Sequence, residues 1–198
     1  MCNLYRMRSG PAEVAALFGA QVPVGANTPQ EVYPGYPGLV TNGKDIRVMN
    51  WGFPLVLTGK KGQSLKPRPV TNARDDKLHS QFWKSSFERR RCLIPVTQWA
   101  EPEGDDGQMT RTWYAPEGQA LFAVAGLWRP TDNWGKCYTM VMVPSCDQMA
   151  QVHDRMPVIL RTEDWAVWLD GQPEEAFALC QTWEGTLAAQ RTQDRWVG

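Results

Sequence analysis

Four things are scarce in this sequence: long apolar runs, histidine, paired cysteines and net charge. No apolar run reaches the length of about 18 residues that crosses a membrane, so we expect no transmembrane helix. The first residues contain no apolar segment of the signal-peptide type, so we expect a cytoplasmic protein. The five cysteines are odd in number and never spaced as Cys-x-x-Cys, which argues against a zinc site or a redox dithiol. We expect free thiols, with no metal and no organic cofactor.

Length and composition favour one domain built mainly from short strands. The 198 residues and 22.4 kDa suffice for the core of a single domain that spans 1–198. Ten tryptophans and 15 prolines favour loops and short strands over a helical bundle. We therefore expect a monomeric α+β protein in which a strand-rich core carries peripheral helices.

Local sequence signals predict the order of the elements. A helix is expected over 11–18, because proline suits its first turn and Gly19 suits its end. A hairpin is expected from 38–41 and 46–51, joined by Asn42-Gly43 in a type I′ turn. Further strands are expected at 92–99, 112–115, 121–128, 137–143 and 157–160. Loops are expected at 20–38 and 54–76, and helices at 78–90, 147–152, 163–169 and 174–183. The residues after 183 receive no role.

The charge is unevenly distributed although it sums to zero. Residues 60–91 hold ten basic and three acidic side chains, a net of +7 that the rest of the chain balances. A concentrated basic face attracts phosphate even on a neutral protein. A solvated surface without a partner is the alternative. The overall neutrality argues against a protein that coats nucleic acid without specificity.

The second residue is a cysteine, which becomes the N-terminus when the initiator methionine is removed. Such a residue carries a thiol with a pKa of about 8.5 beside an α-amine with a pKa of about 7.7–8.0. An aldehyde forms an imine with this amine, and the thiol then closes a five-membered thiazolidine ring. Ring closure is intramolecular because both nucleophiles belong to Cys2. An incidental cysteine on a frayed chain end is the competing interpretation.

Four further polar residues are candidates for chemistry, although none is specific alone. His153 precedes an apolar strand, and its ordinary pKa near neutrality suits acid–base catalysis. Glu101 lies at the end of a predicted strand, while Asn72 and Arg74 lie in the basic loop. A structural hydrogen bond, a turn-forming asparagine or a free surface charge would each explain one of these residues.

Six motifs occur in order along residues 2–160. They are Met1-Cys2, Trp51-Gly52-Phe53-Pro54, Asn72-Ala73-Arg74, Arg91-Cys92-Leu93-Ile94-Pro95 followed by Glu101, Ala125-Gly126-Leu127-Trp128, and His153-Asp154-Arg155-Met156-Pro157-Val158-Ile159-Leu160. Together they closely resemble the SRAP family, the SOS response-associated peptidase or abasic-site processing proteins. The last motif and the position of Cys2 are the most specific elements.

The resemblance implies an SRAP-like, barrel-like fold and a protein that captures abasic sites in single-stranded DNA. It implies that Cys2, freed by removal of the first residue, joins the open-ring sugar aldehyde as a thiazolidine. Asn72 would hold the N-terminus and the sugar, Glu101 would act as acid and base, and His153 would assist proton transfer. An imine at C1′ also acidifies the neighbouring C2′ proton, so a weak lyase side reaction is expected.

The resemblance also suggests how DNA is held. Arg74 and Arg155 are implied as phosphate contacts, and Arg68 in the basic loop is a further expected contact. The aromatic candidates for base stacking are Trp51, Phe53 and Trp99, each of which could instead belong to the core. Asn3-Leu4 stands where many family members have Gly-Arg, so that arginine contact would have to come from Arg6 or Arg8.

Two other functions remain open. An N-terminal cysteine can attack amides with its own α-amine as base, as in N-terminal-nucleophile hydrolases that act on peptides in trans. The basic stretch speaks against this function, because a small amide substrate does not need it. A plain single-stranded DNA-binding module with an incidental cysteine is the second alternative, and it predicts equal affinity for intact and abasic DNA.

Overall fold

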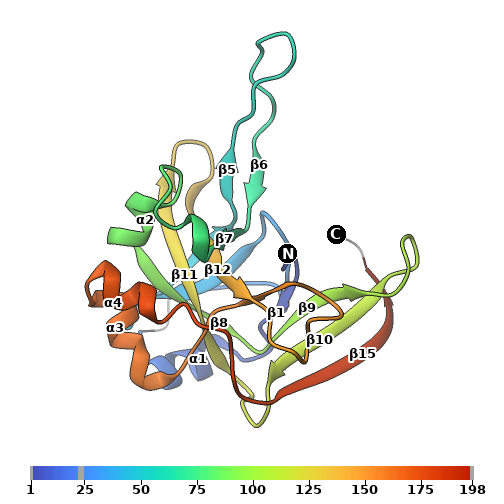
Figure 1. Cartoon of the computed structure of the whole chain (residues 1–198). Coiled ribbons are helices and arrows are strands. Elements are labelled where there is room, and N and C mark those ends of the chain that lie inside the picture. The colour runs from blue at the N-terminus through green and yellow to red at the C-terminus, as the bar shows by residue number, and fades with distance from the viewer. Residues whose placement is uncertain (1, 22–24, 197–198) are drawn as a thin grey trace.

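The core is a closed five-stranded barrel, seen in a computed structural model that describes residues 2–21 and 25–196 (Figure 1). Its strands are β3 (Pro37–Thr41), β4 (Ile46–Trp51), β8 (Arg91–Val96), β11 (Phe122–Thr131) and β12 (Gly135–Pro144). They pair in the order β12, β4, β3, β8, β11 and back to β12, so the ring has no open edge. Only the pairing of β12 with β4 is parallel among these. The predicted α+β fold with a mainly antiparallel barrel is confirmed.

Two glycines allow the barrel to close around its apolar interior. A Cβ on Gly126 would lie 2.8 Å from Ile94 Cδ1 and 2.9 Å from Cys92 Sγ, so β8 and β11 approach closely there. A Cβ on Gly38 would lie 2.0 Å from the hydroxyl of Tyr138 and 2.2 Å from that of Tyr5. These two hydroxyls share a short hydrogen bond in the interior. The glycines therefore provide space that any other residue would fill.

A second sheet lies beside the barrel and holds the N-terminal segment. Its order is β15 (Leu187–Arg195), β10 (Thr110–Pro116), β9 (Gln98–Glu103), β1 (Tyr5–Arg6) and β2 (Glu31–Val32). The chain leaves the barrel at Thr97, so the single strand predicted over 92–99 is wrong and becomes β8 and β9 in different sheets. The residues after 183, which carried no predicted role, include the edge strand β15.

The basic loop predicted over 54–76 is mostly a hairpin that projects from the barrel (Figure 1). Strands β5 (Phe53–Leu55) and β6 (Arg68–Val70) form its root, and we call residues 53–70 the arm. Directly after the arm, β7 (Asn72–Arg74) pairs in parallel with β12. Prolines at three positions of the hairpin weaken the strand signal in the sequence, and this explains why the segment was wrongly predicted as a loop.

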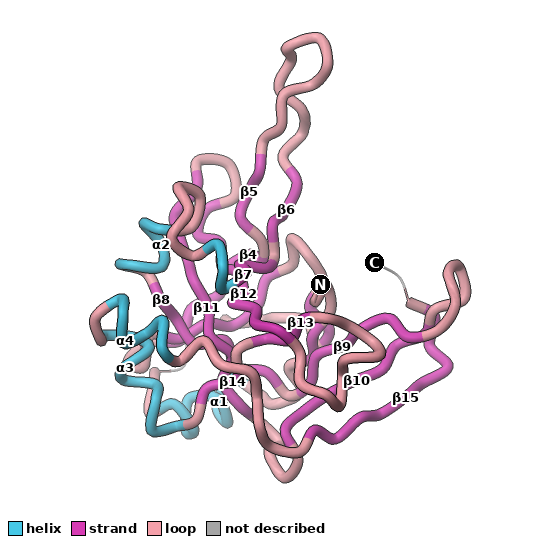
Figure 2. Tube along the Cα trace, viewed as in Figure 1, coloured by secondary structure: helices cyan, strands magenta, loops and turns pink. Residues whose placement is uncertain are grey.

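The helices lie together on one side of the strands (Figure 2). They are α1 (Pro11–Phe18), α2 (Lys84–Arg89), α3 (Trp165–Asp170) and α4 (Pro173–Ala178), with short 3-10 turns η1 (Asp75–Lys77) and η2 (Thr162–Asp164). The first predicted helix is confirmed, and Gly19 ends it in the left-handed conformation with φ 59°. The helices predicted over 78–90, 163–169 and 174–183 are shorter than expected. No helix among the described residues is long and apolar enough to span a membrane.

Three local predictions are wrong in detail. The turn between β3 and β4 is not type I′, because Asn42 has a negative φ and four residues separate the paired ends Thr41 and Ile46. Asn42 instead accepts hydrogen bonds at Oδ1 from two backbone N–H groups of its own turn. Residues 147–152 form turns rather than a helix. The strand predicted over 157–160 divides into β13 (Arg155–Pro157) and β14 (Ile159–Leu160), which pair with β12 and β11 respectively.

Candidate functional site

Strand β12 brings the predicted site segments together. Its Met142 pairs with Arg74 of β7 on one side and with Pro157 of β13 on the other. The motif around Asn72 and the motif around His153 therefore flank the same strand although they are about 80 residues apart in sequence. Strand β1, which follows Cys2, is held between β9 and β2.

Asn72 holds the backbone of Cys2. Its Nδ2 donates to the carbonyl oxygen of Cys2 at 2.8 Å and to Thr71 Oγ1 at 2.8 Å. Because a carbonyl oxygen can only accept, this contact fixes which end of the carboxamide faces Cys2. The other end, Oδ1, is buried, and no described residue donates a hydrogen bond to it. The site therefore retains an acceptor for an N–H or O–H group.

Thr71 positions this arrangement, although sequence analysis gave it no role. Its side chain accepts the bond from Asn72 and donates to Asn3 Oδ1 at 3.3 Å. Its backbone carbonyl accepts from Trp51 Nε1 at 3.2 Å, and the whole residue is only 5% exposed. Nothing in the local sequence distinguishes this threonine from a loop residue, because its partners come from three separate segments.

The Cys2 thiol is enclosed and protonated near neutral pH. The residue is fully buried, and Sγ lies 3.6 Å from the carbonyl oxygen of Leu4. Burial raises the pKa of the thiol well above its ordinary value, and the nearby Glu101 carboxylate raises it further. The thiol is therefore not a ready thiolate in this structure.

Glu101 is a buried carboxyl group that titrates near neutrality. It lies within β9 opposite Thr112, rather than at a strand end as predicted. Burial raises its pKa from 4.5 to about 8, and the Asp154 carboxylate contributes in the same direction. On the same strand Glu103 has a lowered pKa, because Thr112 donates a hydrogen bond to it. The pKa values of these two carboxyl groups on one strand are thus shifted in opposite directions, and Glu101 is the one suited to proton transfer.

His153 is a neutral imidazole with its proton on Nε2. Its Nδ1 accepts a hydrogen bond from the backbone N–H of Arg155 at 3.0 Å, so this nitrogen carries a lone pair. The same Nδ1 also lies 3.2 Å from Asp154 Oδ1, a contact that would be an ion pair only if the ring were protonated. The neutral form agrees better with the structure, since burial lowers the pKa of His153 and the Asp154 side chain is 86% exposed.

Two predicted phosphate contacts are paired with consecutive aspartates. Arg74 donates from Nε and Nη2 to both oxygens of Asp76, at 2.9 and 2.8 Å. Arg155 donates from Nη1 to Asp75 at 2.8 Å across β12. The Nη1 edge of the Arg74 guanidinium takes no part in this pairing and can still bind an anion. Arg68 lies apart from this group, exposed on β6 of the arm.

Several basic and aromatic candidates are part of the structural framework. Trp51, Phe53 and Trp99 are fully buried, so their rings offer no face to a base in this structure. Arg91 is also buried and donates to backbone carbonyls, including that of Phe87 at 2.8 Å. The basic stretch 60–91 is therefore less charged at its surface than its sequence suggests.

Of the two arginines expected to replace the Gly-Arg contact, Arg6 is already engaged by other side chains. Arg6 donates to Glu31 at 2.9 Å, and its guanidinium lies 3.5 Å from the ring centroid of Trp113. Arg8 remains exposed. Of the two candidates, only Arg8 keeps a charged side chain at the surface.

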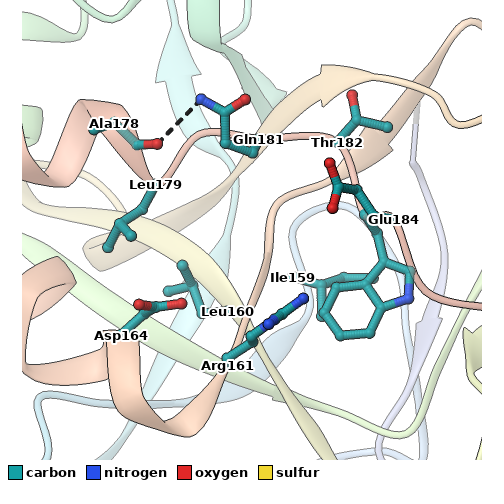
Figure 3. Close-up of a pocket in the computed structure, with 10 residues that line it drawn as sticks. Ile159, Leu160, Arg161, Asp164, Ala178, Leu179, Gln181, Thr182 and Glu184 are labelled. Atoms are coloured by element: carbon teal, nitrogen blue, oxygen red, sulfur yellow. Dashed lines mark hydrogen bonds between the residues drawn. The ribbon is translucent and has the colours of Figure 1, made fainter.

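One surface pocket is lined by none of the predicted site residues. A pocket of about 230 Å³ lies between β14 and the segment after α4, and Arg161, Asp164, Trp183 and Glu184 contribute to its lining (Figure 3). Within the described ranges no group of three or more histidine, cysteine or acidic side chains could hold a metal ion.

Comparisons with known proteins identify a family and a fold. A family model described as SOS response associated peptidase (SRAP) matches residues 1–195. A solved structure from Bacteroides thetaiotaomicron is similar with a TM-score of 0.80 and 18% identity, over 96% of this chain and 91% of that one. One from Bordetella bronchiseptica gives 0.79 and 20%, over 96% and 99%, and a phage-related protein of that organism gives 0.71 and 19%, over 96% and 94%.

These low identities carry information about the fold alone, and comparison with curated proteins gives no match. The family assignment instead rests on the family model, which covers nearly the whole chain. The protein belongs to the SRAP family of SOS response-associated peptidases.

Proposed function

We propose that the protein captures abasic sites in single-stranded DNA by forming a thiazolidine with Cys2 after Met1 is removed. The observation that carries this proposal is the 2.8 Å hydrogen bond from Asn72 to the Cys2 carbonyl, beside the buried Glu101. An incidental cysteine at a frayed end would not be buried and held in this way. The removal of Met1 is the peptidase-type step of the proposal.

The reaction begins at the amine rather than at the sulfur. The free α-amine of Cys2 adds to the C1′ aldehyde and loses water to give an imine. The sulfur then bonds to C1′, and the thiol proton passes to the nitrogen, so the product is protein plus DNA minus one water. This order follows from the raised pKa of the Cys2 thiol, because a neutral thiol is a poor first nucleophile.

Glu101 and Asn72 have distinct tasks in this sequence of steps. With a pKa of about 8, Glu101 is mostly protonated at neutral pH and can donate a proton to the departing water. Once ionised, it can accept the thiol proton during ring closure. The unoccupied Oδ1 of Asn72 would accept a hydrogen bond from the α-amine or from a hydroxyl of the opened sugar. His153, as a neutral imidazole, would donate from Nε2 to a sugar oxygen.

The DNA backbone would be held by the cations around the site. Arg74 in β7 lies on the same side of β12 as Asn72, Arg155 in β13 lies on the other side, and the arm adds basic side chains with no acidic residue between 53 and 70. Phosphate binding by these groups releases counterions, so we expect the first encounter to weaken as salt rises. A completed covalent bond should not be reversed by salt.

Intact mass is the experiment that tests the proposal. The protein is mixed with a single-stranded oligonucleotide that carries one abasic site, and the mass is compared with that of protein plus DNA minus water. The expected result is loss of Met1 followed by a heat-stable adduct. A mature N-terminus that gives no adduct would overturn the proposal.

Two variants make the result specific to the N-terminal residue. Cys2→Ala keeps an α-amine, so it should form only an imine that is lost on heating and can be trapped by borohydride. Cys146→Ala removes a half-buried cysteine and should leave the adduct unchanged. A stable adduct with Cys2→Ala in the absence of reductant would assign the chemistry to another residue.

Hydrolysis of amides in trans is the competing function. The enclosed thiol with its raised pKa disfavours direct thiolate attack on an amide. Cleavage of peptides by the mature protein, without DNA and without an adduct, would favour this hydrolase function over DNA capture.

A further inference from the structure

The Asp76 carboxylate covers the cation that follows the Asn72 motif. Arg74 is the last residue of β7, and Asp76 lies in the turn η1 directly after it. The carboxylate accepts from Nε and Nη2 of Arg74 at 2.9 and 2.8 Å, which occupies the forked edge of the guanidinium. A phosphate binds arginine through the same kind of paired contact. Asp76 therefore stands where a DNA phosphate would bind best.

This ion pair lies at the surface, where its members can exchange partners. The side chains of Arg74 and Asp76 are 46% and 42% exposed, and such pairs contribute little to folding stability. Lys77 Nζ lies 3.8 Å from Oδ2 of the same carboxylate, so Asp76 has a second cation nearby when it leaves Arg74. The neighbouring Asp75 differs, because its partner Arg155 is mostly enclosed and joins η1 to β13 across β12. Asp76 is therefore the carboxylate that a ligand can displace.

Arg74 faces the same side of β7 as Asn72. Residues two positions apart in a strand point to one face, and their Cα atoms are separated by about 6.5–7 Å. Asn72 in turn donates to the Cys2 carbonyl at 2.8 Å. A phosphate next to a sugar that reacts at Cys2 therefore comes within reach of Arg74, the cation that Asp76 occupies.

The two aspartates also set the net charge around this point. They offset the three cations Arg74, Lys77 and Arg155, so that one unit of positive charge remains. The hydrogen bonds from Arg74, together with the positive charges of all three cations, lower the pKa of Asp76, and its carboxylate stays ionised near neutral pH. A phosphate at Arg74 must either displace Asp76 or bind beside its negative charge, and both lower the affinity.

We propose that Asp76 is a specificity-determining residue, which competes with DNA phosphate for Arg74 and keeps the affinity for intact single-stranded DNA low. The proposal rests on the proposed function for its choice of polymer and for Cys2 as the reacting residue. Intact DNA forms no bond with Cys2 and dissociates, whereas an abasic site is retained by the covalent bond. Weak phosphate contacts thus shorten the time spent on undamaged strands and favour the damaged ones.

Binding of intact single-stranded DNA tests the proposal without a covalent step. The probe is a fluorescein-labelled oligonucleotide that has all its bases, and fluorescence anisotropy gives Kd at several salt concentrations. Asp76→Asn should lower Kd about three- to fivefold at about 0.1 M salt, the upper part of the range for one exposed ion pair. The gain should shrink as salt rises, because exposed charges are screened. Asp76→Ser removes the same charge with a different side chain and should show the same gain.

Two controls assign the gain to Arg74. Asp45→Asn is the matched charge change, because Asp45 is an exposed aspartate that pairs with Arg47 at 3.2 Å in another turn, and it should leave Kd nearly unchanged. In an Arg74→Gln background, Asp76→Asn should lose most of its gain, since the pair is already absent. Unchanged or weaker binding by both Asp76 variants would overturn the proposal, and weaker binding would show instead that Asp76 holds Arg74 ready for phosphate. An equal gain from Asp45→Asn, a full gain without Arg74, or no DNA binding by any variant would overturn it as well.

A competition experiment separates this proposal from the proposed function. The rate of adduct formation with an abasic oligonucleotide is measured while intact single-stranded DNA is added. Asp76→Asn should be inhibited by an about three- to fivefold lower concentration of this competitor than wild type. Absence of any adduct, combined with tighter binding by Asp76→Asn, would reject covalent capture and leave Asp76 as a determinant of DNA affinity. An adduct with equal inhibition of both proteins would do the reverse.

Discussion

Glu101→Gln should stabilise the protein, and the gain should grow as the pH rises. In the folded state the Glu101 carboxyl keeps its proton up to about pH 8, whereas an ordinary glutamate releases it near 4.5. Between these values the folded state binds more protons, so the free energy of unfolding falls as pH rises. The pKa difference corresponds to a loss of at most about 4 kcal/mol between about pH 5 and about pH 8.5. Glutamine cannot ionise and avoids this loss.

The assay is urea unfolding of the wild-type protein and the variant at about pH 5, 7 and 8.5. The two unfolding free energies should nearly coincide at the lowest pH and separate steadily above it. Glu103→Gln is a matched control two residues along β9, because the pKa of Glu103 is lowered by Thr112 and Arg191. That variant should be less stable than wild type above about pH 4.5, the opposite sign. Parallel pH profiles for wild type and Glu101→Gln would refute the raised pKa and the acid–base role built on it.

Three further predictions follow from the buried contacts. Thr71→Val should slow crosslinking about tenfold by leaving an Asn72 N–H without its acceptor, whereas Thr71→Ser should retain the rate; single-turnover kinetics checks this. Gly38→Ala should lower the unfolding free energy by about 1–3 kcal/mol in denaturant titrations, because its Cβ would meet the Tyr138 hydroxyl. The lowered pKa of His153 contributes a loss of stability as pH falls below about 6.5, opposite in sign to the contribution of Glu101, so the unfolding free energy of His153→Gln relative to wild type should rise between about pH 7 and pH 5.

Features that depend on neighbours in sequence were predictable. The first helix, the pairing of 38–41 with 46–51 and most strands of the second half follow from local periodicity and turn residues, which act over a few positions. The segments that carry Cys2, Asn72, Glu101 and His153 were also identified from sequence motifs. The structure brings the Cys2, Asn72 and Glu101 segments together, and the shared site that they would form stays a prediction.

Features that depend on distant segments were decided only by the tertiary structure. The arm forms because β5 and β6 pair, which their prolines conceal in sequence. Trp51 is core although it was a candidate for base stacking, and Arg91, one of the basic residues of 60–91, is buried and bonded to backbone carbonyls. Burial is the main reason why the pKa of Glu101 is raised to about 8. Thr71 is positioned by hydrogen bonds to residues of distant segments. A residue's type specifies what chemistry it can perform, whereas desolvation and hydrogen-bond partners, which exist only once the barrel closes, select the chemistry it does perform.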